Sequence, residues 1–171
     1  CLLSRGLGDV YKRQVQHNGK PFIVNTPETD IRVLGTSFNV SAYDNEPYTS
    51  TTLVEGSVRL STAVMEKTLV PKEQGNVFKN KTEIQTKVVN TDLFTSWMRG
   101  KVEFEEENLE AVMRRLARIY DFEYQFENEA AKDYHFTARI DNTQPISSIL
   151  KMLEMTTSVE FKLKENTIII N

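Results

Sequence analysis

The C-terminal third of the chain contains one pattern twice, and this repeat constrains the fold more than any other feature. Residues 109–126 read LEAVMRRLARIYDFEYQF, and residues 146–163 read ISSILKMLEMTTSVEFKL. In both segments apolar residues first recur at the i, i+3, i+4, i+7 spacing of an amphipathic helix, and then alternate with polar residues as in a half-buried strand. The matched positions are Leu109 with Ile146, Val112 with Ile149, Met113 with Leu150, Leu116 with Leu153, and Phe122, Tyr124 and Phe126 with Val159, Phe161 and Leu163.

A strand-like segment precedes each copy, KVEF at 101–104 and YHFTARI at 134–140. The repeat therefore predicts a small α+β module with βαβ-βαβ topology over residues 101–171. Because a helix this short cannot bury its apolar stripe alone, we expect both helices to pack against one shared sheet. The alternative is chance similarity of two amphipathic helices, which the strand at the same offset in both copies disfavours.

Residues 22 to 89 have the alternating pattern of strands throughout, interrupted about every ten positions by glycine or proline. This pattern predicts an all-β N-terminal module of short antiparallel strands, arranged as a sandwich or as a solenoid-like stack. We place this module at 15–92 and a junction at 93–100. Trp97, the sole tryptophan, falls in the junction and is predicted to pack between the two modules.

The first 14 residues, CLLSRGLGDVYKRQ, resemble nothing that follows in pattern or composition, and the chain does not begin with Met. We interpret residues 1–14 as a foreign or disordered leader and exclude them from the fold. The alternative, that Cys1 is the acylated residue of a lipoprotein, is weaker because LLSRGLG is not a typical polar tether.

Composition argues against several classes of function. A net charge of −3 gives no basic surface for nucleic acid, and no apolar run reaches the roughly 20 residues of a membrane-spanning helix. One cysteine and two histidines are too few for a disulfide, a cysteine-rich or histidine-based metal site or a catalytic triad, and no phosphate-binding glycine motif occurs. We therefore expect no catalytic, cofactor-binding or metal-binding residues, and favour a binding or signal-passing module over an enzyme with a nonstandard site.

Several motifs in a fixed order resemble the periplasmic part of FecR-type anti-sigma factors, the iron-dicitrate sensor family. They are TPETDIRVLGTSFNVSAY, TLVEGSVRLS, LVPKEQG and WMRGKVEFEEENLEAVMRRLARIY, and the resemblance covers nearly everything from Phe22 to Asn171. The C-terminal module is similar to the small domain that secretins share with the N-termini of TonB-dependent receptors.

The resemblance implies the periplasmic region of a single-pass inner-membrane protein that regulates iron or nutrient uptake. Its partner would be the signalling domain of an outer-membrane TonB-dependent transducer. An extracytoplasmic-function sigma factor would bind only to a cytoplasmic segment, and a separate helix would anchor the protein in the membrane. The resemblance places both outside these residues. The alternative is a structural or envelope-polymer-binding periplasmic module.

Partner binding is predicted in the C-terminal module, by addition of a strand at an exposed sheet edge. The candidate strand is Thr167, Ile168, Ile169 and Ile170, where three consecutive isoleucines depart from the alternation of the other strands. The alternative is an inner strand covered on both sides. Arg114, Arg115 and Arg118 are predicted to steer an acidic partner.

Overall fold

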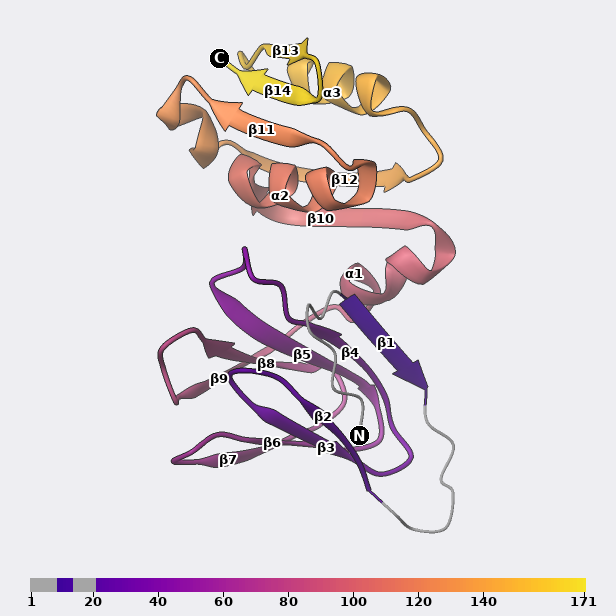
Figure 1. The fold of residues 1–171 in the computed structure, drawn as a ribbon. Coiled ribbons are helices and arrows are strands. Elements are labelled where there is room, and N and C mark those ends of the chain that lie inside the picture. The colour runs from indigo at the N-terminus through magenta and orange to yellow at the C-terminus, as the bar shows by residue number, and fades with distance from the viewer. Residues whose placement is uncertain (1–8, 14–20) are drawn as a thin grey trace. The chain divides into compact units, whose positions relative to one another are not determined.

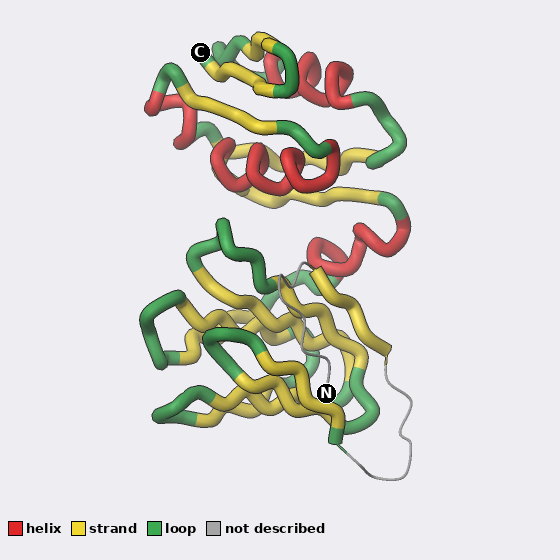
Figure 2. Tube along the Cα trace, viewed as in Figure 1, coloured by secondary structure: helices red, strands yellow, loops and turns green. Residues whose placement is uncertain are grey.

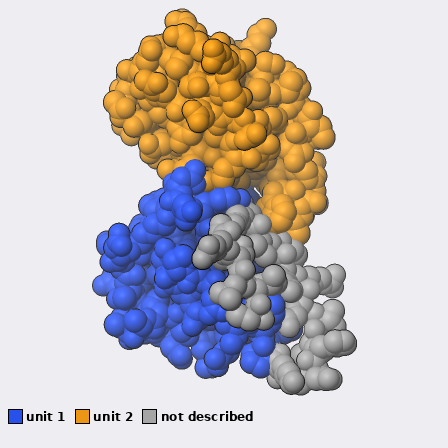
Figure 3. Space-filling model, viewed as in Figure 1, with its two compact units in different colours: residues 1–95 blue, residues 96–171 orange. Residues whose placement is uncertain are grey.

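The computed structural model of the chain describes residues 9–13 and 21–171. The backbone divides into two compact units, Cys1–Thr95 and Ser96–Asn171, coloured separately in Figure 3. The division falls inside the predicted junction 93–100.

Unit 1 contains two antiparallel sheets (Figures 1 and 2). The five-stranded sheet has the order β1 (Asp9–Arg13), β4 (Ser37–Ser41), β5 (Tyr48–Glu55), β8 (Glu73–Phe78) and β9 (Ile84–Val88). The four-stranded sheet has the order β2 (Phe22–Asn25), β3 (Asp30–Val33), β6 (Val58–Ser61) and β7 (Glu66–Leu69). Every pair of neighbouring strands in the two sheets is antiparallel, as predicted for the all-β module.

One apolar core joins the two sheets, so unit 1 is a β-sandwich rather than a stack of solenoid coils. Alternation decides which side chains enter the core: Ile31 and Val33 of β3 are buried, whereas Arg32 between them is exposed. Both sheets contribute to one cluster of buried side chains, namely Val24, Ile31, Val33, Phe38, Val40, Leu53, Val58, Leu60, Leu69, Val77 and Ile84.

The two sheets approach each other closely at Gly75 in β8. A Cβ atom built on Gly75 would clash with Leu60 Cδ1 of β6 and would lie 3.3 Å from Leu69 Cδ2 of β7. Leu60 and Leu69 are fully buried. A side chain at position 75 would therefore have to displace leucine side chains of the opposite sheet.

Part of the predicted leader belongs to the sandwich. Asp9–Arg13 forms β1, which pairs with β4 in a continuous antiparallel register from Asp9 with Ser41 to Arg13 with Ser37. The prediction is a foreign or disordered leader, and the interpretation as disordered does not hold for these five residues, because they form backbone hydrogen bonds with the edge of β4. Residues 1–8 and 14 lie outside the described residues, and the foreign origin of 1–14 stays a prediction.

Two short helical turns lead from unit 1 into unit 2. They are α1 (Asp92–Thr95) and the 3-10 helix η1 (Ser96–Arg99). Unit 2 continues with β10 (Lys101–Asn108), α2 (Leu109–Tyr120), β11 (Glu123–Phe126), the 3-10 helix η2 (Glu129–Asp133), β12 (His135–Asp141), α3 (Ile146–Glu154), β13 (Phe161–Lys164) and β14 (Thr167–Ile170).

The predicted repeat of strand, helix and strand is present in unit 2, as β10-α2-β11 and β12-α3-β13. Helix α2 begins directly after Asn108, which caps it: the Ala111 N–H donates to Asn108 Oδ1 at 2.9 Å. The apolar stripes are buried as predicted, including Leu109 and Leu116 of α2 and Ile149 and Leu153 of α3.

The prediction of one shared sheet is wrong, because unit 2 has two sheets. The strands β10 and β12 pair antiparallel as one sheet, and β11, β14 and β13 form the other in that order. The last strand, β14, lies between β11 and β13, parallel to the first and antiparallel to the second. The backbone groups of β11 and β13 therefore bond to β14 and not to the sheet of β10 and β12. Both sheets and both helices contribute to one core.

The repeat also fails at its last position. The repeat predicts that Leu163 lies on the buried face of a strand, but 64% of its surface is exposed. Its cross-strand partner Ile168 is fully buried. The isoleucines of β14 complete the core here, and Leu163 therefore remains at its margin.

Candidate interaction surfaces

The described residues hold no group of side chains suited to metal chemistry. Within 9–13 and 21–171, no three His, Cys, Asp or Glu residues gather where they could ligate an ion. Among the same residues, no helix has the length and apolar character needed to cross a membrane. The partner-binding residues predicted from the sequence lie on β14 and α2.

The terminal strand cannot receive a partner strand, because β14 is the middle strand of its sheet. Thr167–Ile170 pairs with β11 on one side and with β13 on the other, so its backbone groups are already used. Its three isoleucines are buried. The alternative of an inner strand covered on both sides, which the run of isoleucines left open, describes β14 correctly.

The two edge strands of this sheet are β11 and β13, and hydrogen bonds at the end of β13 show which of its backbone groups point outward. Glu160 and Asn171 exchange both backbone hydrogen bonds, at 3.2 and 3.0 Å. In an antiparallel ladder the bonded pairs alternate, so Lys162 and Lys164 bond to β14, while the backbone groups of Phe161 and Leu163 point away from it. The outward N–H of Phe161 donates to Glu154 Oε1 of α3 at 2.8 Å, which leaves Leu163 as the centre of the outer edge.

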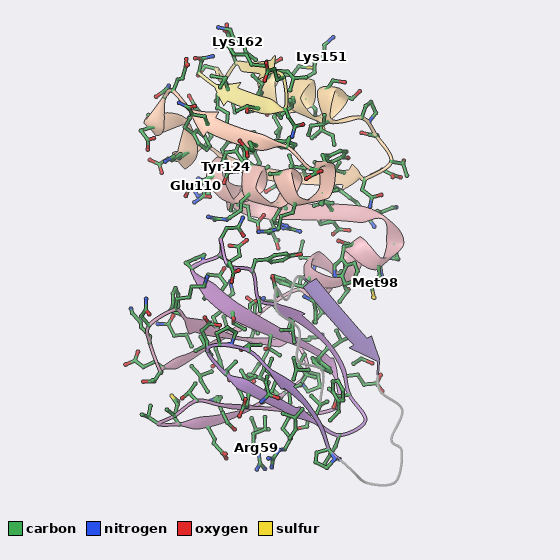
Figure 4. All side chains as sticks on the ribbon, viewed as in Figure 1. Arg59, Met98, Glu110, Tyr124, Lys151 and Lys162 are labelled. Carbon is green, nitrogen blue, oxygen red and sulfur yellow. The ribbon has the colours of Figure 1, made fainter. Side chains whose placement is uncertain are left out.

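The surroundings of β13 combine an apolar side chain, two cations and a hollow. Leu163 is exposed between Lys162 and Lys164, and Lys162 projects outward in Figure 4. A hollow of about 430 Å³ lies between the end of α3 and β13, with Glu154 and Phe161 in its lining. This edge is thus a candidate for strand addition, with room beside it for a partner side chain.

Of the three predicted steering arginines, Arg115 is occupied within unit 2. Its guanidinium donates to both carboxylate oxygens of Glu107, at 3.0 and 3.2 Å, and to the backbone oxygen of Glu103 at 3.1 Å. It also lies over the ring of Phe104, 4.7 Å from the centroid. Arg115 therefore fastens α2 to β10 and is a poor candidate for steering. Arg114 and Arg118 interact with other groups of the chain as well, and their predicted role stays a prediction.

Trp97 lies in η1, at the start of unit 2, with 38% of its surface exposed. It interacts with other groups of the chain. Its packing between the two units stays a prediction.

The loop after β12 is linked to two groups of unit 2 whose pKa values are shifted, Asp141 and Tyr120. The Thr143 hydroxyl donates to Asp141 Oδ1 at 2.7 Å and its backbone N–H donates to the same atom at 3.0 Å, and these bonds lower the pKa of Asp141. The Tyr120 hydroxyl donates to the backbone oxygen of Gln144 at 2.9 Å, and burial, followed by the charge of Asp141, raises the pKa of Tyr120. The loop is thereby tied to the end of α2, which is a structural role.

Sequence reasoning missed one charged surface, on the outer face of the four-stranded sheet. The register places Arg32 of β3 directly opposite Arg59 of β6. Alternation in DIRV and SVRLS predicts that both arginines point outward, but the sequence does not show that the two strands are neighbours. Figure 4 shows Arg59 projecting from this face.

Each of the two units contains a segment that matches a known family model. Residues 101–170 match the family model described as "FecR, C-terminal", and residues 4–59 match the model described as "FecR protein". No curated protein matches the chain.

Two crystal structures of a candidate anti-sigma factor from Parabacteroides distasonis ATCC 8503 are similar to the chain. The structure at 1.65 Å resolution has a TM-score of 0.85 and 27% sequence identity, over 96% of this chain and 77% of that chain. The structure at 2.50 Å has a TM-score of 0.83 and 27% identity, over 95% and 76% of the two chains.

Proposed function

Because the chain belongs to the FecR family of anti-sigma factors, we propose that it is the periplasmic sensor region of such a factor and binds the signalling domain of an outer-membrane TonB-dependent transducer. The observation that carries the proposal is the pair of family matches, which fall on both units. In this proposal occupancy of the periplasmic region is relayed through a membrane helix to a cytoplasmic segment that holds an extracytoplasmic-function sigma factor. We infer that the chain acts by binding and signal relay rather than by catalysis.

The outer edge of β13 is the surface we propose for docking. Leu163 offers an outward N–H and C=O to a partner strand and an exposed apolar side chain beside them. Main-chain hydrogen bonds supply affinity in strand addition, and pockets for alternate side chains supply specificity. The hollow beside Phe161 is in the right place for one such side chain.

A proline substitution at Leu163 tests the docking mode with little risk to the fold. The N–H that proline removes points away from β14, and proline is tolerated on edge strands when its N–H side faces solvent. Binding is measured by biolayer interferometry against purified signalling domains from transducers encoded beside the gene. The substitution removes one backbone hydrogen bond to the partner strand and prevents that strand from approaching closely. Binding should therefore weaken at least about tenfold.

Thr86→Pro is a matched control on β9, the edge strand of the five-stranded sheet. Val89 donates to the backbone oxygen of Lys72 at 2.8 Å, so by alternation the N–H of Thr86 also points away from its neighbour β8. Circular dichroism should show that both variants are folded. If Leu163→Pro binds normally and Thr86→Pro does not, docking belongs to unit 1 and β13 is the wrong surface. If the wild-type chain binds no signalling domain but retains envelope glycans, the structural alternative replaces the proposal.

A further inference from the structure

The outer face of the four-stranded sheet carries two arginines in an unfavourable arrangement. Arg32 and Arg59 are cross-strand partners on adjacent strands, which lie about 5 Å apart in a sheet. Both side chains are exposed. Like charges placed directly opposite each other destabilise a sheet, so this pair costs stability in the isolated chain. We call the pair and its surroundings the arginine face.

The chain does little to neutralise this charge. Arg59 approaches Glu66 only at 4.0 Å, with both side chains more than half exposed, and such a pair contributes little. Among residues 21–171, Arg32 makes no ion pair. The carboxylate nearest in sequence, Asp30, instead accepts a hydrogen bond from Asn25 Nδ2 at 2.6 Å.

The surface around the two arginines is hollowed. A depression of about 290 Å³ contains both Arg32 and Arg59 in its lining, with Leu34 at its margin. A second depression of about 450 Å³ shares Arg32 and extends over Asp30 and Glu66. Leu34 is 47% exposed and adds an apolar contact beside the cations.

We propose that the arginine face binds an acidic, extended segment of a protein partner, through two carboxylates that lie over Arg32 and Arg59. The inference goes beyond the proposed docking at β13, because it concerns unit 1 and a different chemistry. Arginine suits this task, since its planar guanidinium donates two parallel bonds to a carboxylate. Binding would also remove the repulsion between the two cations.

The spacing of the charges fits an extended segment. In an extended chain side chains i and i+2 share one face and lie about 7 Å apart, within reach of two long side chains on neighbouring strands. Two residues along the strands from the arginines lies a second row of cross-strand neighbours. In this row Asp30 is opposite Ser61, and Ser61 is opposite Glu66. This acidic row repels misplaced carboxylates and so fixes the position of the partner.

The test uses the full chain and labelled decapeptides in fluorescence anisotropy. One peptide alternates glutamate with threonine, and its control carries glutamine at each glutamate. The double variant Arg32→Gln, Arg59→Gln should weaken binding of the acidic peptide at least about tenfold, because two charge-assisted contacts are lost. The matched control is the double variant Lys67→Gln, Lys87→Gln, which removes the same charge from exposed lysines of the same unit and should bind the acidic peptide as the wild type does.

Two further readouts separate binding from bulk charge and from structure. Affinity for the acidic peptide should fall steeply as salt is raised, and the glutamine peptide should not bind. Arg32→Gln alone should leave the thermal midpoint unchanged or raise it, whereas a merely structural arginine would lower it on removal.

Equal binding of the acidic and glutamine peptides, or equal loss in the arginine and lysine variants, would overturn the proposal. So would a chain that binds an anionic polysaccharide but not the peptide. Because this assay contains no signalling domain, its failure leaves the proposed docking at β13 standing, and normal peptide binding gives no support to that docking.

Discussion

Replacing Gly75 with alanine tests how unit 1 holds its two sheets together. The added methyl group would clash with Leu60 Cδ1 and crowd Leu69 Cδ2 at 3.3 Å, and both leucines are fully buried. Overpacking of a core costs about 1–3 kcal/mol, and alanine in place of glycine within a strand returns about 0.5–1 kcal/mol. We therefore expect Gly75→Ala to lower the free energy of unfolding by about 1–2 kcal/mol.

A second substitution makes the reasoning specific to this contact. Leu60→Val removes both Cδ atoms, and by itself should cost about 1 kcal/mol for the space it leaves. In the double variant the alanine methyl occupies part of that space, so the two costs should not add. We expect a favourable coupling of about 1 kcal/mol between the two sites.

The assay is urea unfolding of the four proteins in this cycle, followed by far-ultraviolet circular dichroism. Trp97 fluorescence gives a second probe, and because Trp97 lies in unit 2 its transition should move less. Additive costs, or a Gly75→Ala variant as stable as the wild type, would show that Leu60 does not fill the space above Gly75.

Three further predictions concern unit 2. Arg115→Met should lower the free energy of unfolding by about 1–2 kcal/mol in urea titration, because Glu107 loses its two hydrogen bonds in a partly buried site. The hydrogen bonds that lower the pKa of Asp141 stabilise the fold above the carboxyl's ordinary pKa and are lost as pH falls through the folded value. The thermal midpoint of the wild type should therefore approach that of Asp141→Asn in scans taken below about pH 4. Trp97→Ala should cost less than the roughly 3–5 kcal/mol of a fully buried aromatic side chain, because 38% of its surface is exposed, and ready quenching of its fluorescence by iodide would contradict the packing role.

The helices of unit 2 were predictable because their apolar residues follow the helical period. Leu109 and Leu116 are buried as their spacing requires, and Asn108 caps the helix that they begin. The two-sheet arrangement was not predictable. It depends on Ile168 of β14 pairing with Tyr124 of β11, far away in the sequence, and alternation within one strand does not specify its neighbour.

The same limit explains why the candidate sites could be predicted only in part. The sequence predicts that the run at 167–170 accepts a partner strand, and the structure shows the alternative, a buried inner strand; the edge strand β13 was recognisable only after β14 was placed in the middle of its sheet. Arg32 and Arg59 each occupy an outward position that alternation predicts. Their opposition across two strands arises from register, which the sequence of either strand leaves open.

Hydrogen exchange at β13 tests the proposed sensor function most directly. The Leu163 amide points away from β14 and should exchange quickly in the free chain. With a saturating signalling domain from a neighbouring transducer gene, a partner strand should slow exchange of this amide by at least about tenfold, because it accepts the hydrogen bond. A signalling domain that binds the chain and leaves exchange at 161–164 unchanged would contradict docking at this edge, and one that does not bind at all would contradict the sensor function itself.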